Sequence, residues 1–195
     1  MRYILASASP RRREMLTDMG LDFSVITADT DESSTTSSPA ALAEELAARK
    51  GRAVADKLSR EGSLSGNDII ISADTIVVCD KEILGKPKDR EDARRMIKKL
   101  SGRAHTVISG VALTFGEKTF SAHSSTTVCF DEICDEDIER YLDTKEPYDK
   151  AGAYGIQGRA AAWVNRIDGC YFGVVGLPLN TLDKLHRQVI GRPLF

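Results

Sequence analysis

Hydrophobic positions along the chain change repeatedly between strand-like runs and helix-like spacing. Short apolar runs at residues 3–6 and 23–26 predict strands, and the most apolar run, residues 69–79, predicts a buried strand. A hairpin turn at Asp80-Lys81 should follow that strand. Two long β-rich segments follow at residues 106–115 and 118–130, and a last strand is expected at 162–167. The pattern therefore predicts a protein rich in β-structure.

Helical spacing separates these strands. Ser9 as cap and Pro10 as first residue predict a helix that ends at Gly20, with an apolar stripe that includes Met19. Pro39 opens a long helix, and three more are expected at residues 91–100, 135–143 and 179–189. Residues 29–38, polar and rich in Ser and Thr, predict a mobile loop. No repeat or linker interrupts residues 1–195, so we expect one α/β domain with a mixed sheet and two lobes around a cleft.

Composition narrows the class of protein. With 42% apolar and 29% charged residues the chain is typical of globular proteins, and 195 residues allow a substantial core. A net charge of −2 excludes a global basic field, so no nucleic-acid partner is expected. No stretch is long enough to cross a bilayer, and the apolar run before Arg11 is too short for a signal peptide. We expect a cytoplasmic protein without a membrane partner, in which any anion recognition is local.

The spacing of the cysteines and histidines indicates neither a zinc site nor a disulfide framework. The four cysteines lack a Cys-x-x-Cys spacing and several lie in apolar runs, which favours buried free thiols in a reducing cytosol. The three histidines are far apart and lack the spacing of a zinc site. The cysteines are Cys79, Cys129, Cys134 and Cys170. The histidines are His105, His123 and His186.

The segment from Ser7 to Arg13 carries three consecutive arginines at the expected start of a helix. The positive end of the helix dipole makes cations there unfavourable, whereas backbone N–H groups, serine hydroxyls and arginine forks suit phosphate. A solvated basic turn is the alternative, but the position directly after a strand is where α/β folds bind ligands. Lys50 and Lys86 are further candidates for a polyphosphate, although a lone lysine is more often a surface residue.

Asp74 is a carboxylate within the most apolar run of the chain. A buried carboxylate must be paired, protonated or bound to metal, because desolvation is expensive. In a cleft, Asp74 could deprotonate a water molecule and help hold a divalent cation, for which Glu32 could supply another oxygen. The alternatives are a chain bend at Ala73-Asp74 with a capping aspartate, and a solvated loop carboxylate at Glu32.

Residues 149–158 contain three glycines among small and aromatic neighbours. Glycine permits close approach of the backbone to a ligand, and Gln157 has both a donor and an acceptor for a base edge or a water. A plain turn-rich connection is the alternative. Residues 174–178 have the same character and little functional weight by themselves.

Six motifs are spread along nearly the whole chain. They are Ser-Ala-Ser-Pro-Arg-Arg at 7–12, Ser-Ala-Asp-Thr at 72–75, Gly-Lys-Pro at 85–87, Ser-Gly-Arg-x-His-Thr-Val at 101–107, Asp-Lys-Ala-Gly-Ala-Tyr-Gly-Ile-Gln-Gly at 149–158 and Val-Val-Gly-Leu-Pro at 174–178. In order and spacing they resemble the Maf family, also called septum-formation-inhibitor proteins. Two positions depart from the family's pattern: Ser109 and Gly173 stand where Thr and Asn are more often expected.

This resemblance implies a metal-dependent hydrolase that splits nucleoside triphosphates between the α and β phosphates and releases pyrophosphate. It implies an elongated, twisted mixed sheet flanked by helices, a deep substrate cleft, Mg²⁺ or Mn²⁺ as the metal, and a homodimer. By position, Asp74 resembles the proton acceptor. Arg11, Thr75 and Gln157 fall where the family tunes base specificity, and their identities resemble the branch that acts on dTTP and UTP. The family's other polar cleft positions match Ser7, Arg12, Glu32, Lys50 and Lys86.

Two other functions stay open at this point. The first is a pyrophosphatase with the same reaction and another base in its substrate, which removes modified or non-canonical nucleotides. The other is a regulator of cell division that binds a nucleotide without turnover.

Overall fold

The computed structural model describes all 195 residues, and the chain divides into two compact units. Unit 1 comprises Met1–Asp74, Ser109–Ser124 and Gly176–Phe195, and unit 2 comprises Thr75–Ile108 and Ser125–Val175. Three long strands have residues in both units: β3 (Asp68–Cys79), β5 (Ala104–Phe115) and β6 (Lys118–Phe130).

The strands form one seven-stranded sheet in the order β2-β1-β3-β5-β6-β7, with β4 paired to β3. β1 (Arg2–Leu5) runs parallel to both β2 (Phe23–Val25) and β3, with Ile4 opposite Ile70. β4 (Glu82–Leu84) and β7 (Val164–Asp168) pair antiparallel to β3 and β6. The predicted mixed sheet is therefore confirmed.

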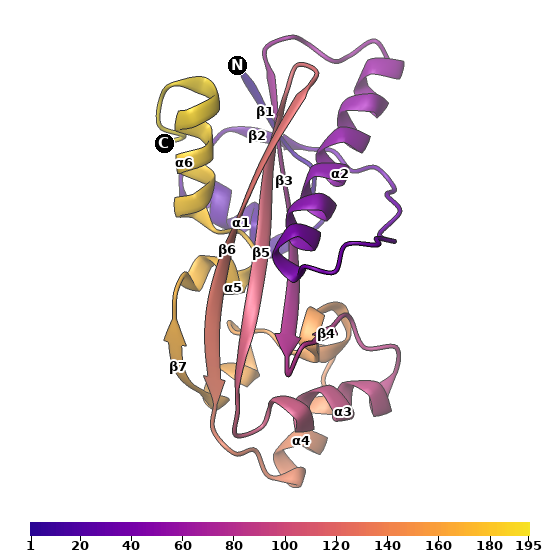
Figure 1. Cartoon of the computed structure of the whole chain (residues 1–195), viewed down its shortest axis with the longest axis vertical. Coiled ribbons are helices and arrows are strands. Elements are labelled where there is room, and N and C mark those ends of the chain that lie inside the picture. Colours follow the sequence, from indigo (N-terminus) through magenta and orange to yellow (C-terminus); the bar gives the residue numbers. More distant parts are fainter. The chain divides into compact units, whose positions relative to one another are not determined.

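Helices are distributed over both units (Figure 1). In unit 1, α1 (Pro10–Asp18) follows β1, and the long α2 (Pro39–Arg60) lies on the other side of the strands from α6 (Leu179–Ile190). In unit 2, α3 (Arg90–Leu100) lies beside α4 (Asp135–Leu142), and Arg94 Nη2 donates a 2.7 Å hydrogen bond to Glu139. Unit 2 also contains α5 (Tyr171–Val175) and short 3-10 helices at Pro147–Asp149, Ala151–Ala153 and Arg159–Trp163.

Apolar packing fixes α2 against the strands of unit 1. Val54 and Leu58 of α2 pack with Ile4 of β1 and Ile70 of β3 in one buried cluster. Gly110 of β5 permits a close approach to α2, because a Cβ there would lie 2.2 Å from the carbonyl oxygen of Ala43. Helix α2 therefore lies directly on the strands, which fixes the position of every side chain that it presents.

An aromatic cluster forms much of the unit 2 core. His105 and Phe130 pack edge to face with ring centroids 4.9 Å apart, and Tyr154 contacts both rings. His105 Nε2 forms a 2.8 Å hydrogen bond with the Tyr154 hydroxyl. Trp163 extends the cluster from the other side of Phe130. Tyr154 thus anchors the glycine-rich stretch, residues 149–158, to the core.

Most predicted elements are present, and their ends differ by a few residues. The strand expected at 162–167 begins at Val164, because residues 159–163 form a 3-10 turn. The hairpin at Asp80-Lys81 is confirmed, with φ of 49° and 69° as a two-residue turn requires. The alternative of a chain bend at Ala73-Asp74 is wrong, because β3 continues unbroken through both residues.

Two expectations about burial are wrong. Among the four cysteines, all free, Cys79 is buried but Cys134 is exposed at the start of α4. Met19 does not extend the apolar stripe of α1, because the helix ends at Asp18 and the Met19 side chain is 41% exposed. An apolar neighbourhood in sequence does not by itself determine which side of an element faces the core.

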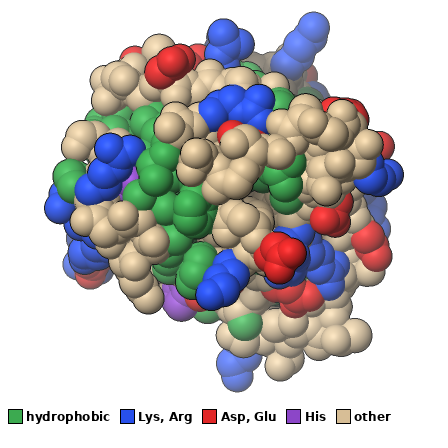
Figure 2. Space-filling view, turned by 90° about the horizontal axis from the view of Figure 1, so that it is seen from above, with side chains coloured by type: hydrophobic (Ala, Val, Ile, Leu, Met, Phe, Trp, Pro, Cys, Tyr) green, Lys and Arg blue, Asp and Glu red, His purple; other side chains and the backbone are tan.

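The surface carries charges of both signs. On the face in Figure 2, Lys and Arg side chains are interspersed with Asp and Glu, and hydrophobic side chains gather near the middle. This pattern agrees with the small net charge of −2. None of the helices combines the length and the apolar character that a bilayer span requires.

Candidate active site

Lys50 of α2 joins two of the predicted carboxylates in unit 1. Its Nζ donates a 2.5 Å hydrogen bond to Asp74 Oδ1 and lies 2.9 Å from Glu32 Oε1. Asp74 lies in the middle of β3, and Glu32 lies in the segment between β2 and α2. The structure therefore brings Glu32, Lys50 and Asp74 together, although they are far apart in sequence.

The two carboxylates favour the protonated form of Lys50. Burial alone would lower the pKa of Lys50, but the charges and hydrogen bonds of Asp74 and Glu32 outweigh it and raise that pKa above its usual value. Lys50 therefore stays protonated at neutral pH, and its ammonium stabilises the Asp74 carboxylate. An ionised carboxylate in a largely buried strand is thus paired, as electrostatics requires.

The alternation of side chains between the two faces of β3 explains why Asp74 faces α2. Side chains two residues apart on a strand lie on the same face, so Asp74 shares its face with Ser72. Ser72 Oγ donates a 2.7 Å hydrogen bond to the carbonyl oxygen of Ala47, also on α2. Lys50 follows Ala47 by three residues, which places it about one helical turn further along.

Arg12 is held at the start of α1 by two oxygen atoms. Its Nη1 donates to Ser7 Oγ at 3.1 Å, and its Nε donates to the carbonyl oxygen of Gly176 at 2.8 Å. Ser7 Oγ also accepts from the backbone N–H of Ser9 at 3.3 Å. These bonds fold the loop after β1 around the guanidinium.

The Arg12 side chain lies in the electrostatic field of Asp74. Burial lowers the pKa of Arg12, the charge of Asp74 opposes that shift, and Arg11 adds to it. Arginine remains charged at any ordinary pH. Of the three arginines, Arg11 and Arg12 are partly buried and Arg13 is exposed, so they do not form a uniform solvated turn.

The oxygen atoms around Lys50 fit the divalent cation that the sequence resemblance implies. No cluster of three or more His, Cys, Asp or Glu side chains is placed to hold a metal ion. Mg²⁺ in phosphate-processing sites, however, is commonly bound by one or two carboxylates together with substrate phosphates. Glu32 and Asp74 already converge on one positive charge, the Lys50 ammonium. This donor set fits Mg²⁺ or Mn²⁺ with the phosphates as further ligands.

The remaining predicted residues belong to unit 2. Thr75 lies on the same face of β3 as Val77. Val77 packs closely against Gly152, because a Cβ on Gly152 would lie 3.1 Å from the methyl groups of Val77. The backbone N–H of Gly152 donates a 3.0 Å hydrogen bond to the carbonyl oxygen of Gly85, the residue before the exposed Lys86. The segments that carry Thr75 and Lys86 therefore both adjoin the glycine-rich stretch.

Glu146 fixes the part of that stretch that carries Gln157. Its Oε1 accepts a 3.0 Å hydrogen bond from the Tyr141 hydroxyl, and its Oε2 accepts one of 3.0 Å from the backbone N–H of Arg159. A Cβ on Gly158 would lie 2.1 Å from Glu146 Oε1. Glycine is therefore needed at 158 for close approach to this carboxylate, and the exposed Gln157 lies directly before it.

Sequence reasoning missed Glu146, the Gly176 carbonyl and Arg49 of α2, which donates hydrogen bonds to the backbone on both sides of Glu32. Gly176 belongs to a motif, at 174–178, that had been given little functional weight. Its glycine, which permits close approach of the backbone, could have indicated a contact there. No sequence signal indicates the roles of Glu146 and Arg49. Each lies beside another charged residue, and such residues are usually solvated.

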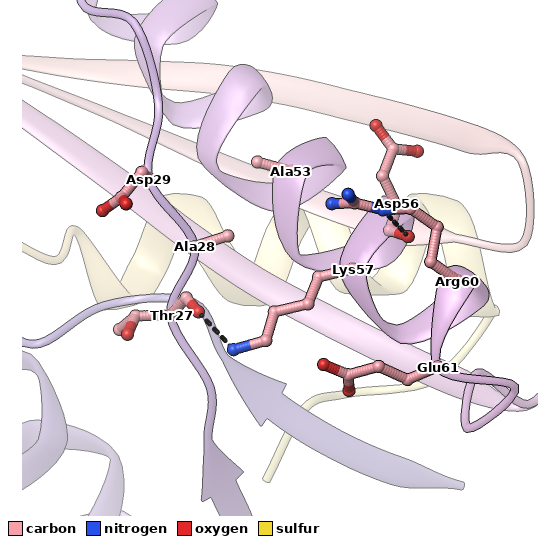
Figure 3. A pocket seen from close by; sticks show the side chains of 8 residues that line it. All are labelled: Thr27, Ala28, Asp29, Ala53, Asp56, Lys57, Arg60 and Glu61. Carbon is pink, nitrogen blue, oxygen red and sulfur yellow. Dashed lines mark hydrogen bonds between the residues drawn. The ribbon is translucent and has the colours of Figure 1, made fainter.

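A hollow of about 630 Å³ lies elsewhere in unit 1 (Figure 3). Residues 27–29 line one side of it and α2 the other, and Lys57 Nζ reaches across to the carbonyl oxygen of Thr27 at 3.2 Å. None of the predicted site residues lines this hollow. It does not belong to the Lys50 trio.

Comparisons with known proteins agree with the motifs. The family model described as Maf-like protein matches residues 2–189. A dTTP/UTP pyrophosphatase of Symbiobacterium thermophilum is 48% identical over 193 residues, which cover 98% of this chain and 95% of the relative. Proteins of the same name from Acetivibrio thermocellus and Alkaliphilus oremlandii are 48% and 49% identical and cover 96% and 95% of this chain, with 95% and 94% of their own lengths matched.

The family model spans almost every element described above, from β1 to the end of α6. The relatives match over nearly their whole length, so the likeness is not confined to one motif. The chain belongs to the Maf-like protein family.

Proposed function

We propose that this chain is a nucleoside triphosphate pyrophosphatase that hydrolyses dTTP and UTP to the monophosphate and pyrophosphate. The observation that carries the proposal is the pairing of Asp74, inside a core strand, with Lys50 and through it with Glu32. A carboxylate at such a position can accept a proton from water. The names of the relatives, dTTP/UTP pyrophosphatase, support the choice of substrate.

Asp74 acts as the general base in this proposal. It accepts a proton from a water molecule as the water oxygen bonds to the α-phosphorus, and the α–β anhydride bond breaks to release pyrophosphate. Lys50 pairs with the carboxylate before the transfer and offsets negative charge on the phosphates afterwards. A bound Mg²⁺ or Mn²⁺, held by Glu32 and Asp74, would offset phosphate charge and polarise the phosphoryl oxygens.

Substrate recognition divides between phosphates and base. Arg12, oriented by Ser7 and the Gly176 carbonyl, binds phosphate oxygens. The family resemblance assigns Lys86 to the polyphosphate as well. Arg11, Thr75 and Gln157 select the pyrimidine, with the Gln157 amide suited to pair with a base edge.

The Asp74→Asn variant tests the catalytic assignment. The amide cannot accept the proton, so we expect pyrophosphate release from dTTP to fall by about 10²–10⁴-fold. Asp80→Asn is the matched control, because Asp80 is an exposed residue at the end of the same strand, with a positive φ that asparagine tolerates. Circular dichroism establishes that both variants fold. Wild-type rates in Asp74→Asn would sink the assignment.

A nucleotide panel separates the alternatives. Wild-type protein is assayed with dTTP, UTP, inosine and methylated guanine triphosphates, each with Mg²⁺, with Mn²⁺ and with a chelator. A preference for the purine analogues would contradict the pyrimidine proposal. It would favour a pyrophosphatase that removes non-canonical nucleotides. Thermal stabilisation by nucleotide without turnover would instead favour a binding regulator.

We further propose a cytoplasmic homodimer. Four free cysteines suit a reducing compartment, and the dimer rests on the family resemblance alone. Light scattering of the purified protein tests it: a monomeric mass would refute the dimer.

A further inference from the structure

Glu32 reaches Lys50 from residues 26–38, which contain no helix or strand. A residue in such a segment is placed by packing or by specific hydrogen bonds, because no backbone ladder fixes it. How Glu32 is held therefore decides whether the trio with Lys50 and Asp74 forms.

Apolar packing holds the first residues of this segment against α2 and does not include Glu32. Ile26 and Ala28 pack against the buried cluster that contains Val54 and Leu58 of α2. Beside this contact, a hollow of about 630 Å³ is lined by residues 27–29 and by α2 (Figure 3). A second hollow, of about 450 Å³, is lined by residues 29–31 and by Arg49 and Arg52. After Ala28 the chain thus runs along this second hollow to Glu32, which is exposed.

Hydrogen bonds from Arg49 hold the backbone on both sides of Glu32. The Nη1 of Arg49 donates to the carbonyl oxygen of Asp31 at 3.0 Å and to that of Ser33 at 2.5 Å. Asp31 and Ser33 are the two sequence neighbours of Glu32. One guanidinium nitrogen therefore clamps the residue that the proposed site needs.

Glu45 completes the clamp from one turn earlier on α2. Its Oε1 accepts a hydrogen bond from Arg49 Nη2, which orients the guanidinium. Its Oε2 accepts hydrogen bonds from Ser34 Oγ at 2.8 Å and Thr36 Oγ1 at 2.5 Å. Those hydroxyl bonds, first from Thr36 and then from Ser34, lower the pKa of Glu45, so it remains a charged acceptor at neutral pH.

We propose that Arg49, oriented by Glu45, is a positioning residue that fixes Glu32 beside Lys50 and Asp74. Arg49 and Lys50 are consecutive on α2, so one turn of this helix supplies both the backbone clamp and the ammonium that the carboxylates bind. Lysine cannot replace Arg49, because a single ammonium lacks the planar fork that serves two carbonyls and a carboxylate together. This inference rests on the proposed pyrophosphatase function of the same site.

The first test compares Arg49→Gln with Arg52→Gln. Both substitutions remove one positive charge from the same helix, and Arg52 is exposed and lines the same second hollow. Residues that orient a metal or substrate ligand typically contribute 10–100-fold to activity, so we expect kcat/KM for dTTP to fall by about 10–100-fold in Arg49→Gln. Arg52→Gln should stay within about two-fold of the wild type. Equal losses in the two variants would overturn the inference, because net charge would then explain both.

A double-mutant cycle with Glu32→Gln tests whether Arg49 acts through Glu32. If it does, Arg49→Gln should lower kcat/KM by less than about two-fold in the Glu32→Gln background, against about 10-fold or more alone. Independent, multiplicative losses would overturn the inference. Wild-type activity in Glu32→Gln would overturn it too, because Glu32 would then have no role for Arg49 to support.

Amide hydrogen exchange provides a readout without substrate or metal. Exchange at residues 31–36 should accelerate in Arg49→Gln and stay unchanged in Arg52→Gln. If the wild type does not hydrolyse dTTP or UTP, the proposed function is wrong. The exchange result then tests by itself whether Arg49 holds the segment around Glu32. Unchanged exchange in Arg49→Gln overturns the positioning role, whichever substrate the enzyme uses.

Discussion

Tyr141 and Glu146 show how one hydrogen bond to a carboxylate organises a functional segment. Burial, and next the charge of Glu146, raise the pKa of Tyr141, so its hydroxyl stays neutral and donates. The carboxylate that accepts this hydrogen bond also accepts one from the backbone N–H of Arg159. Gln157, two residues earlier, depends on that arrangement for its position.

Tyr141→Phe should lower the free energy of unfolding by about 1.5–3 kcal/mol. The change leaves a partly buried carboxylate with one donor fewer, and hydrogen bonds to charged groups contribute about that much. Urea unfolding with an unchanged m-value measures the effect. Tyr171→Phe serves as control, since Tyr171 is 41% exposed, and should shift stability by less than about 0.5 kcal/mol. Equal effects in the two variants would contradict this role for Tyr141.

At the scale of elements, the position of α2 on the sheet decides where the site chemistry lies. One helix carries Lys50, Arg49 and Glu45, and its packing against β5 leaves no room for a side chain at Gly110. Small residues continue this contact in the cluster of Ala47, Ala48 and Ala112. A shift of α2 would therefore move the ammonium and the clamp together.

Gly110→Ala should destabilise the protein by about 3 kcal/mol and lower kcat/KM for dTTP. Its Cβ meets the backbone of Ala43, which cannot rotate away as a side chain could, so α2 must shift. Urea unfolding and steady-state kinetics measure the two effects. Gly66→Ala is the control, because a Cβ at Gly66 meets nothing within 4 Å. Native stability in Gly110→Ala would show that α2 can shift without loss.

At the scale of the whole molecule, stability should depend on pH through His105. Burial lowers the pKa of His105 to about 4, below its ordinary value of 6.5. Below pH 6.5 the unfolded chain therefore binds a proton at this residue that the folded protein does not, so stability falls as the pH falls. The loss grows to about 3 kcal/mol by pH 4.

His105→Gln isolates that contribution. We expect the free energy of unfolding of the wild type to fall more steeply than that of the variant between pH 6.5 and pH 4, because glutamine does not titrate. Urea titrations at several pH values measure both slopes, and other acidic groups cancel in the difference. Parallel slopes would show that His105 does not titrate differently in the folded and unfolded protein.

The elements of the fold could be predicted from sequence because their causes are local. Pro10 and Pro39 begin α1 and α2 as expected, and the apolar run after Asp68 forms β3. Ends were less accurate, as the 3-10 turn before Val164 shows, because short turns depend on contacts distant in sequence. Burial of individual residues failed for Met19 and Cys134 for the same reason.

The sequence by itself determined the family, the mixed α/β class and the list of candidate residues, since motifs and periodicity are properties of neighbouring positions. Only the tertiary structure decided which of those residues meet. Lys50 was a candidate for the site from sequence, but only the packing of α2 on the strands shows that its ammonium joins Asp74 and Glu32. The tertiary structure likewise showed the hydrogen bonds made by Arg49, Glu146 and the Gly176 carbonyl. Their partners lie across the fold, and a hydrogen bond requires positions in space that spacing along the chain does not specify.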